Sequence, residues 1–219
     1  MDSYKRNTDY WDKIFSKKNS VDITSKTTGQ KDVDYGLHWL CNGADSVLDF
    51  GCGNGSMLFK CKLRGSKKHT GIDISSEGIK LAKNAAENYP IDEFDFKVGE
   101  VNSLNDIPDS SFDGVILSNI VDNLIPEDSI KLLVQIKRIL KQDGKIFIKL
   151  NPYITKKQIK DWNIKIIKDN FLDDGLFLWN LKTCEWEKLL CNYFSLIEYR
   201  DIYYHEYNQY NRLFLMKSN

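Results

Sequence analysis

The chain has 219 residues, enough for one domain that buries about 70% of the surface its unfolded form exposes. Lys and Arg together number 31, as do Asp and Glu, so the zero net charge gives no general attraction to nucleic acid or to an anionic membrane. No run of about 18 apolar residues is present, and the first residues lack the apolar core of a signal peptide. Five scattered cysteines form no Cys-x-x-Cys pair, which favours reduced thiols in the cytoplasm over a zinc site or a disulfide framework.

Residues 1–33 are polar and slightly basic, with one apolar group between Tyr10 and Phe15. These aromatic side chains predict a short helix that is held against the surface. The stretch from Ser16 to Lys31 is rich in Ser, Thr and Lys and predicts a loop. A second helix is predicted from Asp34 to Asn42, because its apolar residues recur on one side.

The stretch from Val47 to Ser56 organises the rest of the chain. Its first four residues predict a short buried strand, glycines occupy positions 51, 53 and 55, and an apolar-rich helix follows. Glycine is used where the backbone must turn sharply or let a ligand approach closely. Strand, glycine turn and helix form the nucleotide-binding opening of a doubly wound sheet, in which ligands lie beyond the carboxyl ends of the strands.

Two details of this stretch distinguish between nucleotides. A dinucleotide fingerprint requires Gly-x-Gly-x-x-Gly, but here the sixth position is Ser56 and the third glycine comes one residue early. An acidic residue, Asp49, stands before the first glycine, where a positively charged ligand is favoured over a pyrophosphate. The pattern Asp49-x-Gly51-x-Gly53-x-Gly55 resembles motif I of the class I S-adenosylmethionine-dependent methyltransferases.

The resemblance covers residues 45–150 motif by motif, and the remainder only in the order of its elements. In that family the glycine loop passes beneath the methionine part of the cofactor, and the acidic residue helps to hold the cofactor's amino group. The contacts that this implies in the loop are Asp49, Gly51, Cys52 and Gly53. The resemblance also offers an alternative for residues 1–33, a cap that folds over the cofactor.

The second strand is predicted from His69 to Ile74, and its acidic residue, Asp73, lies about 20 residues after the glycine loop. An acidic side chain at that point can accept hydrogen bonds from both ribose hydroxyls, and Ile74 can lie against an adenine face. This spacing suits dinucleotides and S-adenosylmethionine alike, so it supports a nucleoside without choosing between them. Ser75 is predicted to cap the helix that follows.

A third strand is predicted for residues 94–98, followed by Glu100 and Val101. The family usually has Asp where this chain has Glu100, so the resemblance implies that Glu100 reaches the adenine amino group while the N–H of Val101 meets the ring. The alternative for Glu100 is a solvated acid in a loop. A fourth strand is predicted for residues 111–119. The resemblance implies cofactor contacts at the end of this strand, at Ser118 and at Asn119, beneath the sulfonium.

A helix beginning at Pro126 and a fifth strand at residues 145–150 complete the part that resembles the family. The following Asn151-Pro152-Tyr153 is similar to the Asn/Asp-Pro-Pro-Tyr motif with which adenine-N6 methyltransferases hold a flipped base. That motif belongs after the fourth strand and has a second proline, so a base-flipping role is not favoured.

Residues 154–182 have no counterpart in a minimal seven-stranded sheet. Because an insertion after the fifth strand projects from the cofactor side, it could form a wall or lid of a substrate pocket, or it could only pack a small core of its own. Thr183 is predicted to cap the last helix. The final hairpin is predicted from strands at 195–204 and 212–217.

Methyl transfer from a sulfonium is an in-line displacement, so the protein must mainly position the nucleophile and exclude water. It needs a base only for a poor nucleophile, such as a hydroxyl. Many family members have His a few residues after the fourth strand, where this chain has Asp122 and Asn123. The two candidate catalytic residues are Tyr153 and His205, although a histidine in a hairpin is more often a plain surface residue.

The predicted fold is α/β, a doubly wound seven-stranded mixed sheet of order 3-2-1-4-5-7-6, with the last strand antiparallel and helices on both faces. We expect one domain over residues 1–219, as a monomer or homodimer. The predicted function is an S-adenosylmethionine-dependent methyltransferase that transfers a methyl group to O or N of a small molecule, without a metal, a membrane or nucleic acid as partner. The alternatives are an RNA or protein methyltransferase, a nucleoside-binding module without catalysis, and a dinucleotide-dependent oxidoreductase. The RNA or protein alternative is supported by the basic cluster Lys60, Lys62, Arg64, Lys67 and Lys68.

Overall fold

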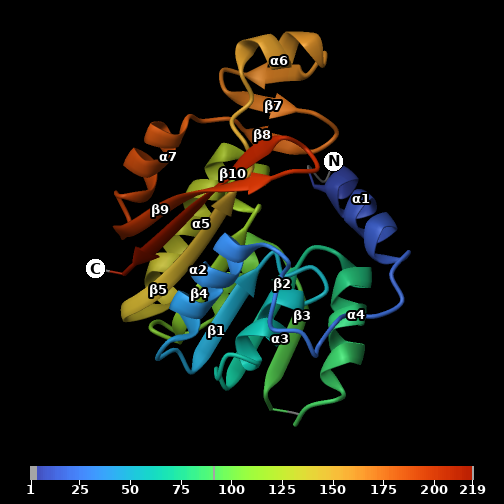
Figure 1. The fold of residues 1–219 in the computed structure, drawn as a ribbon, viewed down its shortest axis with the longest axis vertical. Coiled ribbons are helices and arrows are strands. Elements are labelled where there is room, and N and C mark those ends of the chain that lie inside the picture. Colours follow the sequence, from blue (N-terminus) through green and yellow to red (C-terminus); the bar gives the residue numbers. More distant parts are fainter. Residues whose placement is uncertain (1–3, 91, 219) are drawn as a thin grey trace.

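The computed structural model describes residues 4–90 and 92–218. A seven-stranded sheet lies at its centre and a small three-stranded sheet lies beyond one end of it (Figure 1). The strands of the large sheet are β1 (Ser46–Phe50), β2 (Lys68–Asp73), β3 (Phe94–Val98), β4 (Phe112–Ser118), β5 (Leu140–Leu150), β9 (Ser195–Tyr204) and β10 (Gln209–Lys217). The helices are α1 (Lys5–Phe15), α2 (Lys31–Cys41), α3 (Ser56–Lys62), α4 (Ser76–Ala86), α5 (Pro126–Ile139), α6 (Lys156–Asp161) and α7 (Thr183–Leu190), with short 3-10 helices η1 (Val101–Asp106) and η2 (Val121–Asn123).

The strand order of the large sheet is β3-β2-β1-β4-β5-β10-β9. Strand β10 runs antiparallel to both of its neighbours, β5 and β9, whereas the pairs among β1 to β5 are parallel. Because β9 and β10 are the sixth and seventh strands of this sheet, the predicted order 3-2-1-4-5-7-6 is confirmed. The order reverses between β1 and β4, so the glycine loop after β1 lies at the topological switch point.

Helices cover both faces of the sheet. On one face, α5 and α7 bury Leu132, Ile136 and Trp186 in the larger hydrophobic core. On the other face, α2, α3 and α4 contribute Leu37 and Phe59, among others, to a second core. The central strands are apolar on both sides because both sides are covered, as is usual for parallel sheets.

The insertion at residues 154–182 forms α6 and the small antiparallel sheet of β6 (Lys165–Lys168), β7 (Phe171–Asp173) and β8 (Phe177–Trp179). Its own core is aliphatic and is built around Ile164, Leu172 and Leu178. The aromatic residues Phe177 and Trp179 pack instead against the core of the large sheet, so the insertion is joined to the main body rather than only to itself.

Several boundaries differ from those predicted. Helix α2 begins at Lys31 instead of Asp34, because the side chain of Gln30 caps it by accepting the N–H of Asp32. Thr183 is the first residue of α7 and not its cap. Strand β10 begins at Gln209, since the turn is completed by Asn208 with a positive φ of 48°. Ser75 caps α4 as predicted, its Oγ accepting the N–H of Gly78 at 3.0 Å.

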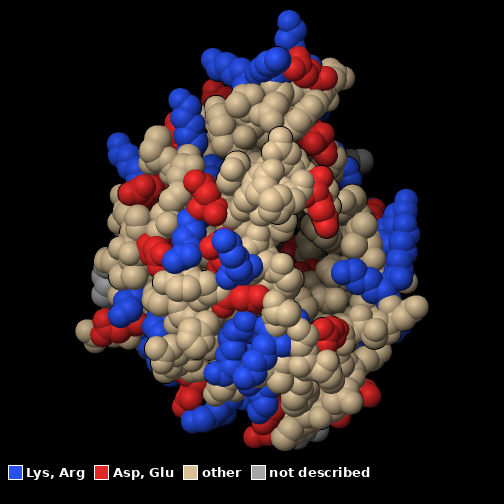
Figure 2. Space-filling view, in the orientation of Figure 1, with Lys and Arg blue, Asp and Glu red and all other residues tan. Residues whose placement is uncertain are grey.

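The surface carries mixed charge. On the face seen in Figure 2, Lys and Arg side chains are interspersed with Asp and Glu rather than gathered over one broad area. None of the helices within residues 4–90 and 92–218 combines the length and apolar content needed to cross a membrane.

Candidate functional site

The glycine loop after β1 has a conformation that side chains would disturb. Gly51, Gly53 and Gly55 all have positive φ angles, of 83°, 54° and 75°. The N–H groups of Gly51 and Cys52 both donate to the carbonyl of Ile72 on β2, at 2.8 and 3.1 Å. A Cβ atom on Gly53 would lie 2.6 Å from Cζ of Phe15, closer than any side chain can be placed without movement. The loop therefore presents bare backbone at the carboxyl edge of the sheet.

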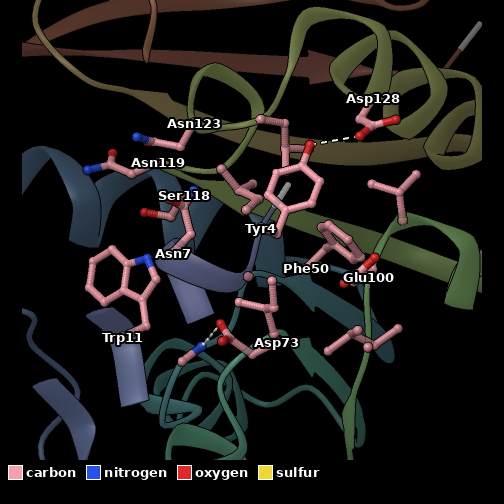
Figure 3. A pocket seen from close by; sticks show the side chains of 18 of the residues that line it. Tyr4, Asn7, Trp11, Phe50, Asp73, Glu100, Ser118, Asn119, Asn123 and Asp128 are labelled. Atoms are coloured by element: carbon pink, nitrogen blue, oxygen red, sulfur yellow. Dashed lines mark hydrogen bonds between the residues drawn. The ribbon is translucent and has the colours of Figure 1, made fainter. Parts of the chain in front are cut away.

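Asp73 at the end of β2 holds this loop in place. Its Oδ2 accepts the N–H of Gly53 at 2.7 Å (Figure 3), and its Oδ1 accepts the N–H of Ser75 at 2.8 Å. Burial raises the pKa of Asp73, and these two hydrogen bonds offset part of that rise. Each carboxylate oxygen retains a further lone pair, so the group can still accept hydrogen bonds from a bound ligand.

A pocket opens above the loop, between the carboxyl ends of the parallel strands and helix α1. Its walls include eight of the ten residues predicted to bind the cofactor: Gly51, Gly53, Asp73, Ile74, Glu100, Val101, Ser118 and Asn119. These residues come from four separate loops along the sheet, and the fold brings them to one cavity.

The other two predicted residues, Asp49 and Cys52, are buried and do not line the pocket. Burial, together with the charge of Asp73, raises the pKa of Asp49 well above its usual value. Its Oδ1 has no hydrogen-bond partner among the described residues. The expected contact between Asp49 and the cofactor's amino group stays a prediction.

One face of α1 lines the pocket. A cap over residues 1–33 is one alternative offered by the sequence, but no residue of that cap is predicted there as a pocket residue. Tyr4, Asn7, Trp11 and Phe15 line the pocket, whereas Tyr10 does not. The signal in the sequence was the spacing of three and four residues, which places side chains on one side of a helix. A separate contact anchors α1, because the carboxylate of Asp12 accepts hydrogen bonds from Ser75 Oγ at 2.6 Å and from the N–H of Glu77 at 3.1 Å.

A hydrogen-bonded set of asparagines forms the wall at the ends of β4 and β5. The Asn151 side chain accepts from Nδ2 of Asn119 at 3.1 Å and donates to Oδ1 of Asn123 at 2.7 Å. Asn119 and Asn123 line the pocket. Lys149 donates to Oδ1 of Asn119 at 2.9 Å, and burial lowers the pKa of this lysine to about 8. Asn151, whose motif did not fit base flipping, therefore positions two pocket residues.

The insertion and α1 meet at the outer side of the pocket. Arg6 on α1 donates to both carboxylate oxygens of Asp173 on β7, at 2.9 and 2.8 Å, and its guanidinium lies 5.4 Å from the ring centre of Phe177. The carbonyl of Phe177 accepts from Nδ2 of Asn123 at 2.8 Å. Tyr4 Oη donates to Asp128 on α5 at 2.7 Å. Helix α1 lines the pocket, and the insertion, which supplies none of the described residues that line it, is joined to α1. We refer to α1 and the insertion together as the cover.

The two candidate catalytic residues lie elsewhere. His205 is exposed in the turn between β9 and β10, with its ring against Tyr203. Tyr153 lines a separate groove between the insertion and that hairpin. His69 is structural, since it is buried and its nitrogens lie 2.8 Å from Ser66 Oγ and 2.9 Å from the carbonyl of Glu93. No histidine in the described residues lines the central pocket.

A family model described as a methyltransferase domain matches residues 42–194. The chain belongs to the class I methyltransferases. It is accordingly an S-adenosylmethionine-dependent enzyme, and this excludes the oxidoreductase and the non-catalytic module. The pocket fits that cofactor, because Gly51 and Gly53 line it without side chains and Asp73 keeps free lone pairs where ribose hydroxyls are expected.

The similar proteins differ in what they methylate. The chain is 29% identical over 198 residues to the protein-lysine N-methyltransferase EFM4 of Saccharomyces cerevisiae, with 78% of this methyltransferase and 81% of the relative covered. It is 37% identical over 106 residues to the ribosomal protein L11 methyltransferase of Dictyoglomus turgidum, but spans only 32% of that protein. The crystal structure of the N-methyltransferase NodS from Bradyrhizobium japonicum with S-adenosylhomocysteine has a TM-score of 0.71 at 11% identity, covering 97% of this chain and 98% of the other, and therefore shows the fold alone.

Proposed function

We propose that this methyltransferase transfers a methyl group to the nitrogen of a small amine that is enclosed in the central pocket. The observation that carries the proposal is the cover. Helix α1 and the insertion are tied to each other by Arg6 and Asp173 and to the main body by Tyr4, Asp12 and Asn123. A cavity closed on this side suits an acceptor that enters whole and is then shielded from water.

An amine is favoured over a hydroxyl because no histidine of the described residues lines the pocket to act as a base. The Tyr4 hydroxyl is a donor to Asp128, and burial raises its pKa, so it stays protonated at neutral pH. An amine needs only to lose its own proton, and an apolar enclosure lowers the pKa of an ammonium group. The lining carries three carboxylates, of Asp73, Glu100 and Asp128, against one lysine, Lys131, which pairs with Asp128. This excess of negative charge favours entry of a cationic ligand over an anionic one.

Different residues of the lining would hold different parts of the cofactor and the acceptor. Asp73, Ile74, Glu100 and Val101 would hold the nucleoside part of the cofactor, and the glycine loop would lie beneath its amino-acid part. When bound, S-adenosylmethionine supplies a methyl group already activated by the sulfonium charge. The protein then has to orient the acceptor nitrogen in line and exclude water, which are tasks for the asparagine wall and the cover.

Transfer to a protein lysine is the second candidate, because the relative that matches over most of both chains is a protein-lysine methyltransferase. An RNA acceptor has less support. Within the basic cluster, Lys62 pairs with Glu93 at 2.5 Å, Arg64 with Asp34 at 3.1 Å and Lys67 with Asp45 at 2.9 Å. Lys60 is buried against the carbonyl of Ser25. The cluster is therefore largely neutralised within the fold.

The test uses S-adenosylmethionine with a labelled methyl group. The purified enzyme is incubated with a cell extract that has been separated by dialysis into small molecules and proteins, and Gly53→Val serves as the inactive control. Label in a dialysable compound as an N-methyl amine is the expected result. Label only in lysine side chains of proteins would overturn the small acceptor in favour of the second candidate, and an O-methyl product would overturn transfer to nitrogen.

A further inference from the structure

Asn7 is the one polar, non-aromatic side chain among the four that α1 turns toward the pocket. It is only 7% exposed, and its Oδ1 is fully buried and has no hydrogen-bond partner within residues 4–90 and 92–218. Leaving a buried amide oxygen without a partner costs about 1–3 kcal/mol, so such atoms in folded proteins call for a reason.

Asn7 differs in position from the other described residues that have a buried polar atom without a hydrogen-bond partner. Buried side-chain atoms without a partner also occur on Asp49, Glu93, Asp122, Trp186 and Arg212 in the described part of the chain, but none of those residues lines the pocket. In Figure 3, Asn7 and Ser118 are seen on the side of Trp11 and Asn119, away from Glu100. Since Glu100 is expected at the adenine, Asn7 stands at the opposite end of the ligand.

A carbonyl oxygen in this place selects the chemistry of its partner. It can only accept, so the partner must carry an N–H or O–H, and a carboxylate would be repelled. At this end of the pocket two amines are expected, the ammonium of the cofactor's amino-acid part and the acceptor amine of the proposed function. We propose that Oδ1 of Asn7 accepts a hydrogen bond from an N–H of the bound ligand at the transfer end. The inference rests on the proposed placement of the cofactor in this pocket.

Three probes separate the two sources of the N–H. Methylthioadenosine contains the nucleoside without the amino-acid part, S-adenosylhomocysteine adds that part, and sinefungin further places a primary amine where the transferred methyl group would be. Affinities for all three are measured by calorimetry for the wild type, Asn7→Leu and Asn7→Asp. Asn105→Leu makes the same substitution at an exposed residue of η1 that does not line the pocket.

Each step of this series is the change in affinity from one probe to the next. We expect Asn7→Leu to make the affinity change at one of these steps less favourable by roughly ten- to a hundredfold. A loss that appears between methylthioadenosine and S-adenosylhomocysteine assigns Asn7 to the cofactor's ammonium, and a loss between S-adenosylhomocysteine and sinefungin assigns it to an amine at the transfer point. Asn7→Asp should keep or strengthen the affected step, because a carboxylate accepts from an ammonium at least as well. Asn105→Leu should leave the series unchanged.

The ratios between probes guard against a general effect on folding, which would weaken all three probes together. Equal ratios in wild type and Asn7→Leu, with normal binding, would overturn the inference alone. A selective loss in Asn7→Asp would also overturn it, because the ligand group would then be an acceptor. If the wild type bound none of the probes, the placement of the cofactor and the inference would both be wrong.

Discussion

In the glycine loop, the contact that fixes the site joins Asp73 to Gly53, which are 20 positions apart in the chain. In the cover, Tyr4 reaches Asp128 over 124 positions and Arg6 reaches Asp173 over 167. The loop depends on backbone conformation and on a carboxylate from the adjacent strand. The cover depends on side chains that meet only after the large sheet has formed. This difference predicts that the glycine loop and Asp73 can hold the cofactor without the insertion.

The glycine loop and the cover should also differ in how strongly a substitution in each affects ligand binding. A side chain at Gly53 collides with a buried aromatic ring and strains a positive φ, so no small rearrangement relieves it. The Arg6 side chain is 52% exposed, and ion pairs at such sites contribute about 0–1 kcal/mol. Substitutions in the loop should therefore act on affinity, and substitutions of the Arg6–Asp173 ion pair should act on ligand exchange.

The largest effect is expected for Gly53→Val. It should weaken S-adenosylhomocysteine binding at least 100-fold, about 2.7 kcal/mol, because the new side chain strains a positive φ and displaces Phe15, which lines the pocket. Calorimetry measures this directly. The matched control is Gly29→Val, at a φ of 82° with nothing within 4 Å of a Cβ, which should bind as the wild type does. Comparable affinity in both variants would remove the loop from the cofactor site.

Deleting residues 156–178, with a short Gly-Ser bridge, tests whether the cover is separable. Affinity for S-adenosylhomocysteine should stay within about tenfold, roughly 1.4 kcal/mol, because the loop and Asp73 are untouched. Methyl transfer to the acceptor found in the labelling experiment should fall much further, by about 100-fold, since orientation and water exclusion are lost. Full turnover by the deletion variant would show that the insertion is no lid.

Asp73→Ala should weaken S-adenosylhomocysteine binding by about 1.5–3 kcal/mol, the usual loss for hydrogen bonds that involve a charged group. The loss has two origins, since the carboxylate is expected to bind ribose and also holds the N–H of Gly53. Asp95→Ala is the control, because Asp95 is an exposed acid on the neighbouring β3. If Asp73→Ala folded and bound as tightly as Asp95→Ala, the ribose assignment would fail.

The smallest effect is expected for the ion pair of the cover. Arg6→Gln and Asp173→Asn should each speed the release of S-adenosylhomocysteine by roughly two- to fivefold at low salt, about 0.4–1 kcal/mol. The double variant should release the ligand no faster than either single one, because the two side chains act through one contact. Stopped-flow fluorescence measures release, and Lys5→Gln on the same helix is the control. Additive effects would mean that Arg6 and Asp173 act independently.

The sequence by itself determined the sheet order, the glycine loop and the place of Asp73. These follow from patterns within short stretches: buried strands, glycines at alternate positions, and an acidic residue at the end of the next strand. Residues that follow parallel strands must meet at one edge, which is why eight of the ten expected cofactor residues line one pocket.

Only the tertiary structure decided which residues lie where we propose that the acceptor binds. It brought Asn7 and Asn123 to the lining of one pocket, with Asn151 hydrogen-bonded to Asn123, and it placed His205 and Tyr153 away from that pocket. No local pattern marks an asparagine that will face a cavity, because its neighbours come from segments more than a hundred residues distant or from loops whose path is set by packing. Backbone conformation is encoded locally, whereas the meeting of side chains depends on the whole fold.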